Sequence, residues 1–212
     1  MKLILDNTYD KITSPYGRVL VEKLRSYSDV LSITKRRNLY FNLREILFCY
    51  IILEGYFGVY RKNDSRLLAI VSYPTILGMK GMLNIKTDIF LKALTPAKVG
   101  RLTVDNFHSF IQRENLWEEL AKHLVLLSER LYISSEQINA PTATEMVLTQ
   151  LQELMLEPDI IRNNITAESY IRDKTGLSRS RIMGVLSELK KSGHIDIYKG
   201  ILLRLSINME SS

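Results

Sequence analysis

Apolar residues change their spacing twice along this chain, and each change marks a different kind of element. Ser14-Pro15 places a capping hydroxyl and a first-turn proline at the start of a helix that we expect to run to about Val30. From about Ser32 the apolar segments become short, and after Thr103 the helical period of three and four residues returns.

Turn residues divide the middle segment into runs of five to eight residues rich in Ile, Val, Tyr, Phe and Leu. The strongest breaks are Glu54-Gly55, 62–65, Ser72-Tyr73-Pro74, Gly78, Gly81 and Thr95-Pro96. This texture predicts an antiparallel β-sandwich or small barrel. Residues 56–61 and 66–71 flank a polar turn and form the best predicted hairpin.

Two helices are predicted next, a short one over 104–112 and a long one over about 114–138. After Trp117 the long helix carries leucines in the three-four spacing of a coiled-coil seam, at Leu120, Leu124, Leu127 and Leu131. We predict that these leucines form a dimer interface. Packing of the same residues within one subunit stays open as the alternative, because Val125 and Leu126 lie off the seam.

Asn139-Ala140-Pro141-Thr142 breaks the helical pattern and predicts a domain boundary. We therefore expect a sandwich domain with its long helix over 1–138 and a second domain over 139–212. The second domain should begin with a helix over 142–157 that Pro158 ends, followed by two helices and a hairpin. The predicted fold class is α+β.

Residues 166–189 have the pattern of a helix-turn-helix. Thr166 with Ser169 begins the first helix, and Gly176 supplies the positive φ that a tight turn between helices requires. Ser178 caps the second helix, in which apolar residues stand at the helical spacing i, i+3, i+4 and i+7, namely Ile182, Val185, Leu186 and Leu189.

The opposite face of the second helix is slim, polar and basic, as a helix that enters the DNA major groove requires. Gly193 ends this helix, and residues 195–205 form a hairpin with Lys199-Gly200 at its tip, which indicates a wing. The predicted DNA contacts are Ser178, Arg179, Ser180, Arg181, Gly184, Ser187, Lys191 and Lys199.

Charge supports a polyanionic partner. The formal net charge is +6, and residues 166–204 hold eight Lys and Arg against four Asp and Glu, a net +4. Each phosphate that a protein neutralises steepens the salt dependence of binding, so this concentration of charge matters energetically.

Other classes of protein fit the chain less well. A single cysteine, Cys49, in the apolar run 46–53 excludes a disulfide framework and a four-thiolate cluster within one subunit, and we expect it to be a buried small side chain. His108, His123 and His194 stand in separate elements, without the spacing of a metal site, and no nucleophile-elbow, P-loop or Rossmann pattern occurs. We expect no enzyme, no metal and no cofactor.

Asp6 interrupts any signal-peptide core, and no apolar run is long enough to span a bilayer, so we expect a cytoplasmic protein without membrane contact.

Together these features resemble the CRP/FNR superfamily of bacterial transcription regulators, whose N-terminal domain is a cyclic-nucleotide-binding-like jelly roll. The resemblance is most specific over 171–195, in Gly176-Leu177-Ser178-Arg179 and in the apolar spacing of Ile182 to Leu189. The segment 189–200 also resembles the enterobacterial IprA-like branch. By position, the resemblance implies that Arg179 reads a base or a phosphate, with Ser178, Ser180 and Arg181 beside it.

The chain departs from the family pattern at two positions of the effector-binding site and at two positions of the helix-turn-helix. Gly78-Met79 stands where nucleotide-binding members have Gly-Glu for the ribose, and no arginine stands near Ile89 to pair the cyclic phosphate. Gly184 replaces the family's third cation of the recognition helix. Arg172 lies in the first helix of the helix-turn-helix, four residues before Gly176, where a small residue is usual in the family. Its size could keep the two helices from packing closely.

The predicted function is therefore sequence-specific binding of double-stranded DNA by a homodimer on an inverted repeat. We expect no cyclic-nucleotide or iron–sulfur control, an effector of unknown identity, and RNA polymerase as a further partner. An alternative function, which salt dependence would distinguish, is a protein-interaction module that docks through its winged helix.

Overall fold

The computed structural model describes residues 14–83, 88–136 and 142–206, and for 129–136 it describes the backbone alone. The chain forms two compact units: the first comprises residues 1–63 and 68–131, and the second comprises residues 64–67 and 132–212, so the main division falls inside the long helix. The boundary predicted at 138–139 lies outside the described residues.

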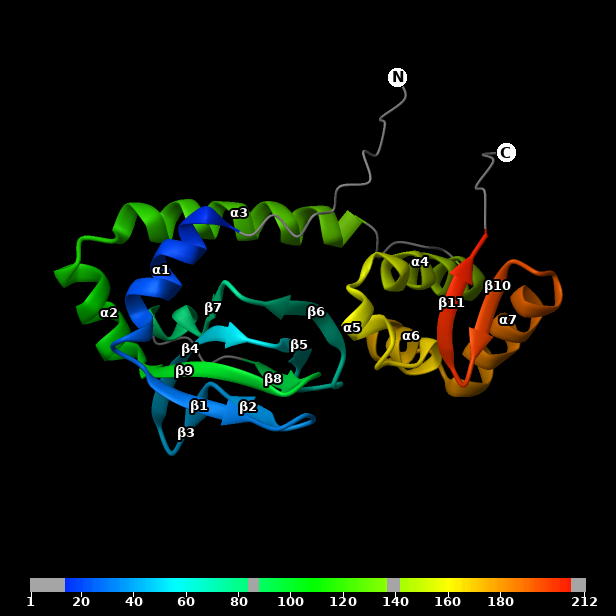
Figure 1. Cartoon of the computed structure of the whole chain (residues 1–212), viewed down its shortest axis with the longest axis horizontal. Coiled ribbons are helices and arrows are strands. Elements are labelled where there is room, and N and C mark those ends of the chain that lie inside the picture. The colour runs from blue at the N-terminus through cyan, green and yellow to red at the C-terminus, as the bar shows by residue number, and fades with distance from the viewer. Residues whose placement is uncertain (1–13, 84–87, 137–141, 207–212) are drawn as a thin grey trace, which may run out of the picture. The chain divides into compact units, whose positions relative to one another are not determined.

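The first unit is built on two antiparallel sheets (Figure 1). One sheet has the order β1 (Asp29–Ile33), β9 (Ala97–Thr103), β4 (Ile46–Glu54), β3 (Asn42–Leu43), with β7 (Thr75–Leu77) also paired to β4. The other has the order β2 (Asn38–Tyr40), β8 (Ile89–Ala93), β5 (Tyr56–Arg61), β6 (Leu67–Ser72). The predicted antiparallel sandwich is confirmed, and the predicted hairpin is the β5–β6 pair.

Strand β4 explains the longest apolar run in the chain. Successive side chains of a strand point to opposite faces, and both faces of β4 are buried. Tyr50 and Ile52 lie in the core between the two sheets, whereas Cys49 and Ile51 lie in a second core against helices. The run therefore shows no alternation of apolar and polar residues, because both faces of the strand are buried over its central residues 49–52.

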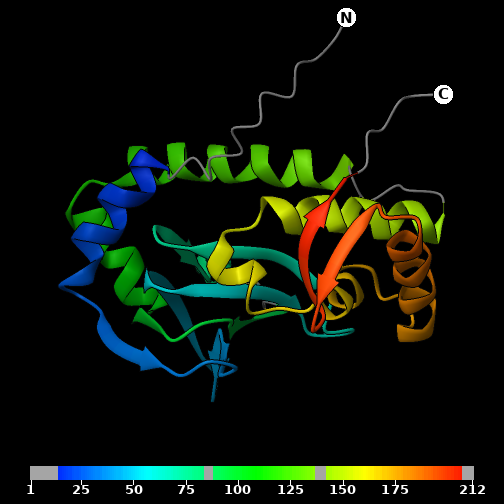
Figure 2. The ribbon, with the colours of Figure 1, turned by 45° about the vertical axis from the view of Figure 1, so that its right-hand side comes forward.

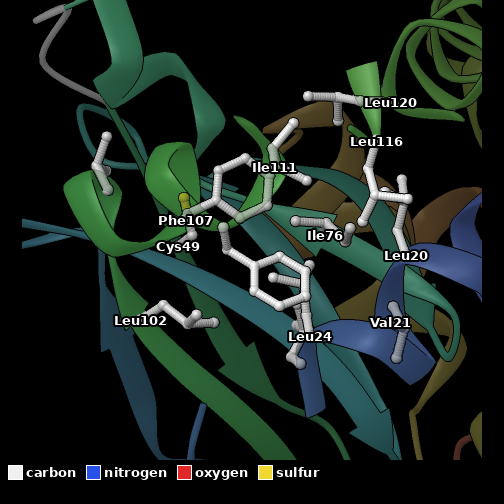
Figure 3. Close-up of a cluster of buried hydrophobic side chains, with 13 residues drawn as sticks. Leu20, Val21, Leu24, Cys49, Ile76, Leu102, Phe107, Ile111, Leu116 and Leu120 are labelled. Carbon is white, nitrogen blue, oxygen red and sulfur yellow. The ribbon is translucent and has the colours of Figure 1, made fainter. Parts of the chain in front are cut away.

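Helices cover that second core (Figure 3). It is lined by α1 (Pro15–Arg25), α2 (Val104–Arg113) and the start of α3 (Trp117–Glu136), with the short 3-10 helix η1 (Met79–Leu83) packed against it. Ser14 caps α1 by accepting a hydrogen bond from the Gly17 amide at 3.0 Å, as predicted, and Thr103 caps α2 in the same way.

Two predicted helix boundaries in this unit are wrong. α1 ends at Arg25, not near Val30, because Val30 belongs to β1 and pairs with Gly100 of β9. The long helix begins at Trp117, not at Glu114, because Asn115 adopts a left-handed conformation (φ 51°) that separates α2 from α3. In both places the backbone leaves the helical conformation at residues whose apolar spacing does not reveal it.

Cys49 is fully buried, as expected. Burial raises the pKa of its thiol to about 12, because the apolar surroundings disfavour the thiolate. A thiol that stays protonated at neutral pH is a poor nucleophile and a poor metal ligand. Cys49 therefore acts as a small packing residue (Figure 3).

The second unit contains four helices and a hairpin within residues 142–206. They are α4 (Ala143–Leu156), α5 (Asp159–Arg162), α6 (Ala167–Thr175), α7 (Arg179–Lys191), β10 (Ile195–Tyr198) and β11 (Ile201–Leu205). Thr142 and Glu145 form a capping box at the start of α4, so Thr142 precedes the helix rather than belonging to it. The one-turn helix α5, which begins directly after Pro158, was not predicted.

No helix within the described residues is sufficiently long and apolar to cross a membrane.

Candidate nucleic-acid interface

The turn between α6 and α7 forms as the sequence predicts. Thr166 caps α6, and Gly176 ends it with φ 73°, a conformation that glycine adopts without a steric penalty. The Gly176 amide donates to the Arg172 carbonyl at 2.8 Å, and the Leu177 amide donates to Thr175 Oγ1 at 3.2 Å. These local bonds hold the chain in the sharp reversal that starts the second helix.

Arg172 does not obstruct the packing of the two helices. Its Nη1 lies 2.7 Å from Glu168 Oε1, one turn earlier on α6, and its Nε lies 3.7 Å from Asp173 Oδ1. The guanidinium is thus held on the outer side of α6, while Tyr170 and Ile171 of the same helix are buried. The departure from the family pattern is accommodated at the surface.

Polar contacts support α6 from α4. Glu153 of α4 forms an ion pair with Lys174, whose Nζ lies 3.1 Å from the Glu153 carboxylate. It also accepts a hydrogen bond from the Tyr170 hydroxyl. Burial, with the negative charges of Glu157 and Glu153, raises the pKa of Tyr170, so its hydroxyl remains a donor. No local pattern signals this pairing, because it joins residues about twenty positions apart on different helices.

Helix α7 buries one face and exposes the other. Ile182, Val185 and Leu186 are buried, and Ser178 caps the helix by accepting from the Arg181 amide at 3.3 Å. All the residues predicted to contact DNA are exposed, and all but Lys199 belong to α7 or its cap, namely Ser178, Arg179, Ser180, Arg181, Gly184, Ser187 and Lys191.

The end of α7 is joined rigidly to the hairpin. The His194 amide donates to the Leu189 carbonyl and the Gly193 amide to the Lys190 carbonyl, which is the Schellman pattern, with Gly193 at φ 74°. Lys190 Nζ then donates to the Ile197 carbonyl of β10 at 3.2 Å. Figures 1 and 2 show the hairpin beside α7 and α4, consistent with the contacts of β10 and β11.

The tip of the hairpin is anchored to the helix-turn-helix. Lys199 and Gly200 both have positive φ, 48° and 84°, as in a two-residue hairpin turn of the type I′ class. The Gly200 carbonyl accepts from the Ala167 amide at the start of α6 at 2.8 Å. A Cβ at Gly200 would lie 2.9 Å from Thr166 Cγ2, so this close approach requires glycine.

Two exposed side chains of this surface were not among the predicted contacts. Tyr198 is 62% exposed at the wing, and Lys199 Nζ lies 5.4 Å from its ring centroid. Met183 of α7 is 47% exposed. Both had a signal in the sequence, since Tyr198 directly precedes the basic turn and Met183 falls outside the apolar spacing of α7.

This surface can bind a polyanion. Arginines and lysines of α7 and the wing supply positive charge, and the partial positive charge at the start of α7 adds to it next to Arg179 and Arg181. The serines on α7 add hydrogen-bonding groups that carry no charge. This combination of backbone-binding and edge-reading groups is typical of a DNA-binding winged helix.

The proposed seam on α3 needs one correction. Leu120 is only 4% exposed and packs in the core of its own unit with Leu116, so it is not available to a second copy. Leu124 is 43% exposed and Leu127 is half-buried, whereas the side chain of Leu131 lies outside the described residues. The usable part of the seam therefore begins at Leu124.

At two positions where the resembling family contacts a cyclic nucleotide, this chain has apolar residues. Met79 is half-buried and packs against the apolar core that contains Cys49, where a ribose would need a carboxylate. Ile89 begins β8 and pairs with Arg61 of β5, so no arginine occupies that position to meet a phosphate. Neither residue could offset the desolvation of a bound cyclic phosphate.

Metal chemistry has no support among the described residues, where no cluster of three or more His, Cys, Asp and Glu side chains could hold an ion. His123 is 1% exposed, and its Nδ1 lies 3.0 Å from Ser14 Oγ, so it is a core residue. His194 Nδ1 lies 2.7 Å from Ser192 Oγ, and His108 packs edge-on against Trp117.

Comparisons with known proteins agree with this geometry. The protein family described as Winged helix-turn-helix DNA binding matches residues 143–209. The chain is also similar to the protein named Inhibitor of hydrogen peroxide resistance, with 26% identity in both Salmonella typhimurium and Escherichia coli. Each alignment covers 74% of this chain and 76% of the relative. These are the IprA-like relatives that residues 189–200 indicate.

Solved structures of transcription regulators share the fold. The c-di-GMP-responsive global regulator CLP of Xanthomonas campestris matches with a TM-score of 0.73 and 16% identity, over 90% of this chain and 99% of that one. A CRP/FNR-family regulator from Thermus thermophilus matches with a TM-score of 0.62 and 18% identity, over 84% and 94%. The chain thus has the CRP/FNR fold, and the proteins that share it here are regulators, not enzymes.

Proposed function

We propose that this chain, with the fold of a CRP/FNR regulator, is a sequence-specific DNA-binding transcription regulator that works in the cytoplasm as a homodimer on an inverted repeat. The observation that carries the proposal is the exposed polar and basic face of α7, which the Gly176 turn and the anchored wing hold in one orientation. RNA polymerase is a further proposed partner.

Selection of duplexes from a random library tests this function directly. We expect the bound sequences to converge on two half-sites about one helical turn apart, as two symmetry-related recognition helices require. Affinity for the selected duplex should fall steeply between about 50 and 200 mM salt. If no duplex is retained even at low salt, the protein-interaction alternative is favoured and the proposal fails.

Dimerisation through α3 gives a separate prediction. Leu124 and Leu127 are apolar side chains with exposed surface on a charged helix, so a carboxylate there would have to be buried in the dimer. Leu124→Glu and Leu127→Glu should each produce a monomer with weakened binding to the inverted repeat, measured by analytical ultracentrifugation and gel retardation.

Lys122→Glu is the matched control for these variants. Lys122 is exposed on the opposite side of α3 and pairs with Glu118, an exposed ion pair of small energetic value. This variant should remain a dimer. A dimer that persists in Leu124→Glu and Leu127→Glu would refute the α3 interface.

We further propose that neither a cyclic nucleotide nor an iron–sulfur cluster controls the protein. The support is Met79 in place of a carboxylate, the missing arginine near Ile89, and a single buried cysteine. Calorimetric titration with cyclic AMP, cyclic GMP and, because CLP is c-di-GMP-responsive, cyclic di-GMP should detect no sub-micromolar binding. Sub-micromolar affinity for any of the three would contradict this part of the proposal.

A further inference from the structure

Met183 is the most exposed apolar side chain of α7. Its side chain is 47% exposed, whereas Ile182, Val185 and Leu186 of the same helix are buried in the unit and Leu189 is half-buried. Its neighbours on the exposed surface are serine, glycine, arginine and lysine side chains. The exposed part of this side chain is therefore available to an apolar group of a partner.

Gly184, the next residue, also favours contact between this part of α7 and a partner. A Cβ built at Gly184 would meet no atom within 4 Å, so nothing in the described structure requires glycine there. Glycine in an exposed helix interior is less stable than alanine, because it loses more backbone freedom on folding. The absence of a side chain does allow a partner to approach the backbone of α7 closely.

Helical geometry places the two residues together at the approach surface. Successive residues of an α-helix are about 100° apart, so Gly184 lies on the outward face with Ser180 and Ser187, and Met183 lies at its edge. Arg179 stands four residues before Met183, on the same side of α7. Met183 would therefore follow Arg179 along the path that the helix takes over the bases.

Only one apolar group is displayed on base edges in the major groove, the C5-methyl of thymine. Methionine offers no hydrogen to donate, and its flexible thioether adapts to an apolar partner. We infer that Met183, with close approach permitted by Gly184, reads a thymine methyl within each half-site. This inference rests on the proposed DNA-binding function and assigns a specificity-determining residue to it.

The test removes the methyl group and nothing else. In the duplex selected by the unaltered full-length protein, each thymine of one half-site is replaced in turn by deoxyuridine, and affinity is measured by fluorescence anisotropy. At one thymine the replacement should weaken binding about fourfold, the value expected for one buried methyl group. In Met183→Ala the same replacement should have no effect, because the contacting side chain is already absent.

Conservative variants separate contact from folding. Met183→Leu keeps an apolar side chain and should keep the sensitivity to deoxyuridine, whereas Met183→Gln, of similar length but polar, should lose it. Gly184→Ala should raise the melting temperature of the protein and yet weaken duplex binding, two changes of opposite direction. A merely structural role for either residue would move stability and affinity together.

The outcomes distinguish this inference from the function on which it rests. If no duplex is bound, the DNA-binding proposal itself fails. If a duplex is selected and bound, three results each overturn the assignment of Met183: a half-site without thymine, a wild-type affinity that no deoxyuridine changes, or a sensitivity that persists in Met183→Ala. An unchanged affinity of Gly184→Ala would overturn the close approach.

Discussion

Replacing Arg179 and Arg181 together by alanine should lower affinity for the selected duplex at least about a hundredfold at moderate salt. Both side chains are exposed in the first turn of α7, where a recognition helix meets bases and phosphates. A base contact by arginine is worth about 1–3 kcal/mol, and each lost phosphate contact lowers the slope of log affinity against log salt by about one. Anisotropy titrations at several salt concentrations measure both quantities.

Arg18 and Arg25 provide the control. Both are exposed on α1 in the first unit, so Arg18→Ala with Arg25→Ala removes the same charge from the protein without touching the winged helix. Affinity should then change little. Melting temperatures of both double variants should match the wild type, since exposed side chains contribute little to stability. If the α7 variant kept its affinity within about threefold, the DNA-binding surface would have to lie elsewhere.

Phe107→Ala should reduce the free energy of unfolding of the first unit by about 3–5 kcal/mol, the usual effect of removing a large buried aromatic side chain. Phe107 is 0% exposed and packs among α1, α2 and β4 beside Cys49 (Figure 3). The resulting cavity cannot collapse easily, because its walls belong to a sheet and several helices. This prediction concerns the core that supports α3, rather than the DNA surface.

Trp117 makes the measurement specific. It is the only tryptophan of the chain and packs against the same core, so its fluorescence during urea unfolding reports on the first unit. Val19→Ala, at an exposed position of α1, is the control and should change the unfolding free energy by no more than about 0.5 kcal/mol. A loss below about 1 kcal/mol in Phe107→Ala would mean that this core does not stabilise the unit.

Local chemistry made much of the winged helix predictable. Ser14, Thr166 and Ser178 cap the helices that they were predicted to cap, because capping depends on a side chain and an amide three residues away. Gly176 and the Lys199-Gly200 turn were predictable for the same reason, since positive φ values favour particular residues.

Elements that depend on distant partners were harder to predict. Leu31 has near-helical spacing from the apolar residues before it, but it lies in β1, which forms because β9, far along the chain, offers a pairing edge. The bond from Ala167 to Gly200 and the ion pair of Lys174 with Glu153 likewise join segments that are far apart along the chain. No local pattern encodes such contacts.

The candidate DNA surface likewise has features that the local sequence predicts and features that depend on distant parts of the chain. The exposed face of α7 could be identified from the amino acids alone, because apolar periodicity states which side of a helix must be buried and leaves the rest to solvent. The folded chain was needed to show that Leu120 belongs to its own core while Leu124 does not, and that Gly184 meets no neighbour. Periodicity specifies the direction in which a side chain points, whereas burial also depends on what the rest of the chain places there.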